Sequence, residues 1–81
     1  MPLPNSNEIL NMGRELRRRR RALGLTQAEL AALCNVGNRF VSELENGKPS
    51  LEIGRVLKVL EAVGLGLMLR PRDWERIDAP R

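Results

Sequence analysis

The sequence predicts an all-α domain of four to five helices, followed by one short β-strand. Apolar residues recur at helical spacing through most of the chain, glycines interrupt this pattern, and the spacing changes to two after Gly64. The 81 residues suffice for one small domain. A domain of this size buries only about 60% of its unfolded surface, so association of two copies would add stability.

Composition divides the chain into four parts. Residues 1–5 contain two prolines and no periodicity, and we expect a disordered arm. Residues 6–64 form the helical domain, residues 65–71 the strand, and residues 72–81 a charged tail.

The first helix is expected over residues 6–23, capped by Ser6 or Asn7 and ended by Gly24, with Gly13 as a point where it can divide. It contains five consecutive arginines, at 17–21. Five successive positions surround a helix, so these arginines do not share one face. Arg20 falls on the inward stripe with Leu16 and Leu23, where a charge needs a partner. Arg14, Arg17, Arg18 and Arg21 are expected to form a solvated face, and the alternative is that some of them add long-range attraction to DNA.

The second helix is predicted from Thr26 to about Leu33, because residues 26–29 have the form of a capping box. Asn35 tolerates a left-handed backbone and supplies a turn. A third helix is then expected over residues 38–46, with Gly37 as its N-cap and Gly47 after its end.

Small or apolar residues are placed where these two helices would meet across the turn. They are Leu30, Ala31, Cys34, Val36, Val41 and Leu44. Such a pair, supported by the first helix, presents its second member to the major groove of DNA. A helical bundle that does not bind nucleic acid is the alternative.

The fourth helix is expected to open at Pro49–Ser50, with Glu52 in its first turn, and to stop at Gly64. Its apolar stripe comprises Ile53, Val56, Leu57, Leu60 and Val63.

The strand that follows has no partner strand elsewhere in the chain, and an unpaired strand edge is a liability. Pairing with its copy in a homodimer would bury an interface made of Leu65, Leu67, Met68 and Leu69. The alternative is a strand that folds back on its own helices.

The positive net charge favours an anionic binding partner, although a need for solubility alone would explain this charge equally well. The net charge is +4, and twelve of the fourteen basic residues are arginines, which suit phosphate and guanine. With no His and one Cys, the chain offers no catalytic pair, metal site or cofactor site, so we expect no enzyme. A single-strand RNA binder would need more stacking aromatics.

Cysteine usage and hydropathy indicate a cytoplasmic protein. The lone Cys34 has no disulfide partner, and no apolar run approaches the roughly 20 residues that cross a bilayer. The N-terminal residues do not form a signal peptide, so we expect no membrane association.

Two motifs, Thr26-Gln27-Ala28-Glu29-Leu30-Ala31 and Val41-Ser42-Glu43-Leu44-Glu45-Asn46-Gly47-Lys48, resemble those of the phage-repressor-type (XRE) helix-turn-helix family. The resemblance covers roughly residues 12–63. It implies a lambda-repressor-like DNA-binding fold, and it makes Glu45 the expected partner of Arg20.

The resemblance also assigns DNA contacts to the third helix. Asn38, Arg39 and Ser42 fall where the family touches base edges. Asn suits adenine and Arg suits guanine, both through two hydrogen bonds. Phe40 would contact a thymine methyl group, or else pack against the first helix.

Three further positions are expected at phosphates: Gln27, Gly37 and Lys48. The family usually has a polar residue at position 37, whose side chain contacts a base. Gly37 has no side chain, so we expect that base contact to be missing.

The layout is also similar to HipB-type antitoxins, through residues 23–27, 45–49 and 64–71. This narrower resemblance implies a homodimer on an inverted-repeat operator in the bacterial nucleoid, repression of its own operon, and a HipA-like kinase toxin as partner. Trp74 is the possible toxin anchor, although a lone tail Trp more often packs on its own domain. There are two alternatives: a stand-alone repressor without a toxin, and a protein-interaction module that does not bind DNA.

Overall fold

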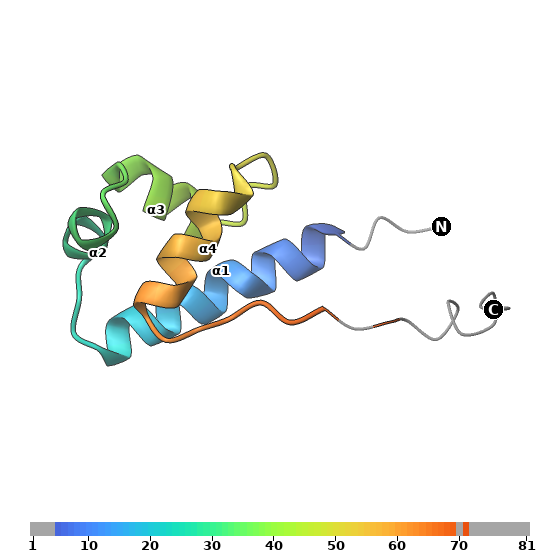
Figure 1. Ribbon diagram of the computed structural model, residues 1–81, viewed down its shortest axis with the longest axis horizontal. Coiled ribbons are helices and arrows are strands. Elements are labelled where there is room, and N and C mark those ends of the chain that lie inside the picture. Colours follow the sequence, from blue (N-terminus) through green and yellow to red (C-terminus); the bar gives the residue numbers. More distant parts are fainter. Residues whose placement is uncertain (1–4, 70, 72–81) are drawn as a thin grey trace, which may run out of the picture.

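The structure, a computed structural model, describes residues 5–69 and 71, with side chains from residue 8 onward. This part of the chain forms four helices: α1 (Asn5–Ala22), α2 (Gln27–Cys34), α3 (Asn38–Glu45) and α4 (Ile53–Ala62). Figure 1 shows the long α1 lying beneath the three shorter helices. α3 packs against both α1 and α2, and α2 also packs against α4. The prediction of an all-α domain of four to five helices is confirmed for the described residues, which form four.

α1 is one continuous helix, and the division at Gly13 was wrong. It begins at Asn5, inside the segment expected to be a disordered arm. Gly13 is buried where α1 crosses the end of α3, and a Cβ atom there would lie 2.5 Å from the Leu44 carbonyl oxygen. The glycine therefore allows a close approach of two backbones, which local sequence does not reveal.

The turn between α2 and α3 follows the prediction closely. The Thr26 hydroxyl accepts a hydrogen bond from the Glu29 backbone N–H, and the Glu29 carboxylate accepts one from the Thr26 N–H. Asn35 takes the left-handed conformation, with φ of 57°. α2 and α3 are therefore held in a fixed relation by a short turn.

α4 starts later than expected. Glu52 is its N-cap, and Pro49 and Ser50 lie in the loop before it. The turn and bend over residues 49–51 bring Leu51 against the core before the helix begins. The predicted stripe was also wrong at Ile53, which is exposed, while Val59 is fully buried.

The core joins all four helices around ten buried residues. They are Leu16, Leu30, Ala31, Cys34, Val41, Leu44, Val56, Val59, Leu60 and Val63. Leu23, expected on the inward stripe, is 51% exposed because α1 ends before it and the chain reverses at Gly24.

The segment after α4 shows no strand in the described residues 65–69. A strand needs a partner, and the predicted partner is a second copy, so pairing across a dimer stays a prediction. The charged tail 72–81, with Trp74, lies outside the described residues. No described helix is both long and apolar enough to cross a bilayer.

Candidate nucleic-acid interface

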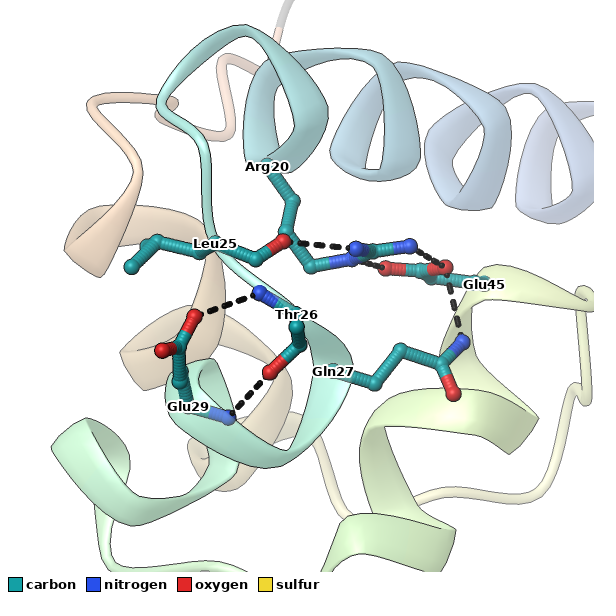
Figure 2. A network of polar contacts seen from close by, with 6 residues as sticks. All are labelled: Arg20, Leu25, Thr26, Gln27, Glu29 and Glu45. Carbon is teal, nitrogen blue, oxygen red and sulfur yellow. Dashed lines mark hydrogen bonds and ion pairs between the residues drawn. The ribbon is translucent and has the colours of Figure 1, made fainter.

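A buried ion pair fixes α3 to α1 (Figure 2). Arg20 donates from Nε to Glu45 Oε2 at 2.6 Å and from Nη2 to Oε1 at 3.1 Å. Its third nitrogen, Nη1, donates to the Leu25 carbonyl oxygen at 2.8 Å. Arg20 and Glu45 are only 7% and 6% exposed. One guanidinium thus ties together α1, the loop before α2, and the end of α3.

Gln27, at the start of α2, joins the same network. Its Nε2 donates to Glu45 Oε1 at 3.0 Å, so the carboxylate receives three hydrogen bonds. Burial works to raise the pKa of Glu45, but the hydrogen bonds from Arg20 and Gln27 outweigh it and lower the pKa. The hydrogen bond to Glu45 raises the pKa of Arg20 against its desolvation. Both groups are therefore charged.

Gln27 was predicted to meet a phosphate, and the structure adds a role that sequence reasoning missed. Eighteen positions separate Gln27 from Glu45 in the chain, and no local pattern links them. Its phosphate contact stays a prediction, as do those of Gly37 and Lys48.

α3 has a buried arc and an open arc. Val41, Leu44 and Glu45 are buried, and Phe40 is half-buried against the core. At about 100° per residue, Asn38, Ser42 and Arg39 span an arc about 100° wide, which begins beside Glu45 and turns away from Val41 and Leu44. Asn38 and Arg39 are exposed, and Ser42 is half-buried. The three polar base-contact candidates therefore share one outward surface, whereas the ring of Phe40 packs inward.

A charged cluster on this open arc was not anticipated. Glu43 accepts a hydrogen bond from Arg39 Nε at 3.0 Å and another from Lys48 Nζ at 3.3 Å. Desolvation works to raise the pKa of Glu43, but these two cations lower it. The only signal in the sequence was the spacing of four between Arg39 and Glu43. The Arg39 side chain is 88% exposed, so its guanidinium remains accessible to an external acceptor.

The start of α3 is open. Its N-cap, Gly37, makes no side-chain capping bond, and a Cβ atom placed there would meet nothing within 4 Å. The Phe40 N–H donates to the Gly37 carbonyl oxygen at 3.0 Å, which leaves the N–H groups of Asn38 and Arg39 without a partner within the helix. This end of α3 can therefore accept an anionic oxygen close to its backbone.

Arg19 has a structural role that sequence reasoning missed. Its Nε and Nη2 donate to the Val63 carbonyl oxygen at 3.0 and 2.9 Å. Val63 is the C-cap of α4, where a cation also complements the helix dipole. Arg19 therefore fastens the end of α4 to α1.

The described residues contain no group of acidic, Cys or His side chains placed to hold a metal ion. The single thiol, Cys34, is buried, and this burial raises its pKa. It behaves as a core residue.

Comparison with known proteins agrees with this geometry. A helix-turn-helix family model matches residues 16–68, which include the α2–turn–α3 unit. An uncharacterized HTH-type transcriptional regulator, y4mF of Sinorhizobium fredii (strain NBRC 101917 / NGR234), is 46% identical over 48 residues. That alignment covers 59% of this chain and 63% of the relative. The chain belongs to the helix-turn-helix family, of the phage-repressor (XRE) type.

Proposed function

We propose that this protein is a sequence-specific DNA-binding transcriptional regulator that reads operator DNA with the outer arc of α3. The observation that carries the proposal is the division of α3 into a buried arc and an open arc. Arg20, Glu45 and Gln27 anchor the inner side, while Asn38 and Arg39 remain exposed on the outer side.

The side chains of the outer arc suit direct reading of base edges. The Arg39 guanidinium can donate two parallel hydrogen bonds to guanine O6 and N7, and the Asn38 amide can pair with adenine N6 and N7. Glu43 holds Arg39 through an exposed ion pair, which contributes little stability and is readily exchanged for another acceptor. Family membership and the regulator name of the relative support the same function.

A random duplex library tests this proposal. The purified protein should retain a defined sequence at moderate salt, and Arg39→Ala should lose or change that sequence. Arg55→Ala is the matched control, because Arg55 is also exposed and paired with a glutamate, Glu52, but lies on α4. Enrichment without any consensus, or one unaffected by Arg39→Ala, would contradict the proposal.

The regulator is proposed to act as a homodimer joined through residues 65–71. Met68 and Leu69 are 83% and 87% exposed, an unfavourable state for large apolar side chains in a monomer. Leu65 and Leu67 continue this surface into an apolar groove of about 570 Å³ between α1 and α4. Two copies related by a dyad would place their α3 helices about 34 Å apart, or at a multiple of this spacing.

Leu67→Arg tests the dimer. The variant should sediment as a monomer and bind the selected duplex more weakly, since each half-site would then be read alone. A dimer of undiminished affinity would contradict the proposed interface.

The narrower role, a HipB-like antitoxin that represses its own operon and neutralises a HipA-like kinase, rests on sequence resemblance alone. Trp74 is its proposed anchor for the toxin. Deletion of residues 72–81 should abolish inhibition of such a kinase while leaving duplex binding intact. Full inhibition by the shortened protein would remove the tail from this role, and absence of any inhibition by the whole chain would favour a stand-alone repressor.

A further inference from the structure

Four arginines of α1 line one hollow on the surface of the protein. They are Arg14, Arg17, Arg18 and Arg21. All four side chains are exposed, and their spacing of three, four and seven residues places them on one side of the helix. At about 100° per residue they occupy an arc roughly 100° wide.

The run of arginines at 17–21 thus separates into two groups by helical angle. Arg20 points inward to Glu45, and Arg19 binds the carbonyl oxygen at the end of α4. The remaining three join Arg14 at the hollow. Arg19 and Arg20 therefore join α1 to other helices and stabilise the fold. Among the residues that the structure describes, the four arginines at the hollow have no such structural role.

Few negative charges face this hollow within the described part of the chain. Glu15 forms an ion pair with Arg18, and Glu45 lies near enough to feel the charge of Arg17. Cations three and four residues apart on a helix repel one another, so the arrangement is unfavourable for the isolated protein. An external polyanion would relieve this repulsion.

The position of the hollow identifies the polyanion. Arg19 marks the flank of α1 that faces α4, whereas Gly13 marks the contact with the end of α3. Arg17 follows Gly13 on that second flank, beside Glu45, which also binds Gln27 at the start of α2. On the side of Arg17, the hollow therefore lies beside the end of α3 and the start of α2, the two helices that carry the proposed DNA contacts.

We propose that Arg14, Arg17, Arg18 and Arg21 bind phosphates of duplex DNA that flank the base pairs read by α3. This inference rests on the proposed function and extends the same interface onto α1. From Arg14 to Arg21 the helix rises about 10 Å, which spans two or three phosphate steps of one strand. Guanidinium groups suit this contact because each one can donate two parallel hydrogen bonds to a phosphate.

The test compares the whole protein with a variant that combines Arg14→Gln, Arg17→Gln, Arg18→Gln and Arg21→Gln. Affinity for a long duplex is measured against salt concentration. Each lost phosphate contact should reduce the magnitude of the slope of log K against log salt by about 0.9, so loss of all four contacts should reduce it by about 3.6. Arg55→Gln, on α4, removes one exposed arginine outside the proposed interface and should leave the slope unchanged.

Duplex length supplies a second readout. The wild type should bind a duplex with flanking base pairs at least tenfold more tightly than one trimmed to the selected sequence, and the fourfold variant should lose this difference. Equal slopes and equal length dependence in the two proteins would overturn the inference. Loss of binding to anionic lipid vesicles or acidic peptides with unchanged DNA binding would overturn it too, and would assign the hollow to that partner.

The outcomes separate this inference from the proposed function. If both proteins select the same consensus and have the same slope, the α1 arginines do not bind phosphates, and the proposal that α3 reads bases still holds. If the variant has a reduced slope but the wild type selects no consensus, the α1 arginines do bind phosphates, and the proposal of sequence-specific reading is rejected. Far-UV circular dichroism should show equal helix content, and thermal melting should show an unchanged or raised Tm, because the substitutions remove repulsion.

Discussion

α3 takes part in two arginine–glutamate pairs that share their chemistry and differ in their surroundings. Glu45 meets Arg20 in the interior, with two hydrogen bonds and a third from Gln27. Glu43 meets Arg39 through one hydrogen bond at the surface. The first pair joins separate elements, whereas the second lies within one helix and leaves its arginine accessible. Burial thus decides which pair builds the fold and which is free to bind a ligand.

Breaking the buried pair should have the largest effect. Glu45→Ala leaves the Arg20 guanidinium buried without its counter-charge, and such a loss costs about 3–5 kcal/mol of the free energy of unfolding. Small domains have about 5 kcal/mol in total, so only about 0–2 kcal/mol should remain, and up to about half of the molecules should be unfolded at 25 °C. Urea denaturation measures the loss.

The combined change Arg20→Met and Glu45→Leu is the control for this experiment. Replacing both charges by apolar groups of similar volume is often nearly neutral, so most of the stability should return. If the double variant were as unstable as Glu45→Ala, the charge pair would not be the cause.

Disturbing the close approach beside this pair should have the next largest effect. Gly13→Ala would place a methyl group 2.5 Å from the Leu44 carbonyl oxygen and push α1 away from α3. Overpacking of this kind costs about 1–3 kcal/mol of the free energy of unfolding. Gly54→Ala is the matched control within α4, where nothing lies closer than 4.0 Å, and it should stabilise by about 0.5–1 kcal/mol. Equal effects of the two substitutions would contradict the tight crossing.

Acid should weaken the buried pair by a smaller amount. The pKa of Glu45 in the folded protein lies below its ordinary value of 4.5. A lowered pKa stabilises the folded state above the unfolded pKa, and this stability is lost as the pH falls through the folded pKa. The free energy of unfolding should therefore decrease as the pH is lowered below about 4.5, less steeply in the Arg20→Met, Glu45→Leu variant. An identical pH dependence in both proteins would contradict this linkage.

The exposed pair should contribute least to folding. A double-mutant cycle on Arg39 and Glu43 should give a coupling below about 0.5 kcal/mol, as for other surface pairs at this spacing. Thermal or urea unfolding of the two single variants and the double variant supplies the cycle. A coupling above 1 kcal/mol would mean that this pair is structural, and Arg39 would then be less available to DNA.

Local signals in the sequence predicted most of the fold. The capping box at Thr26 and Glu29, the left-handed Asn35 and the reversals at Gly24, Gly47 and Gly64 appear as expected. These features depend on neighbouring residues only. Gly13 and the start of α4 were misjudged because each depends on a contact with a distant part of the chain, the end of α3 in one case and the core beneath Leu51 in the other.

The candidate site was only partly accessible to sequence reasoning. Helical periodicity placed Arg20 inside, and the structure pairs it with Glu45 as the family resemblance implied. Periodicity did not reveal that Arg19 would reach Val63, or that Gln27 would join Glu45. Those contacts link residues 44 and 18 positions apart, and only the packing of the helices brings them together.

The central claim, that α3 reads bases with its open arc, is tested most directly by pairing one protein change with single base-pair changes. The selected duplex and its single base-pair variants are titrated with the wild type, Arg39→Ala and Arg55→Ala. The wild type should discriminate at the guanine facing Arg39 by about 1–3 kcal/mol, and Arg39→Ala should lose discrimination at that position alone. Arg55→Ala should keep it. Uniformly weaker binding of Arg39→Ala to every duplex, with all preferences retained, would contradict the claim and reduce Arg39 to a phosphate contact.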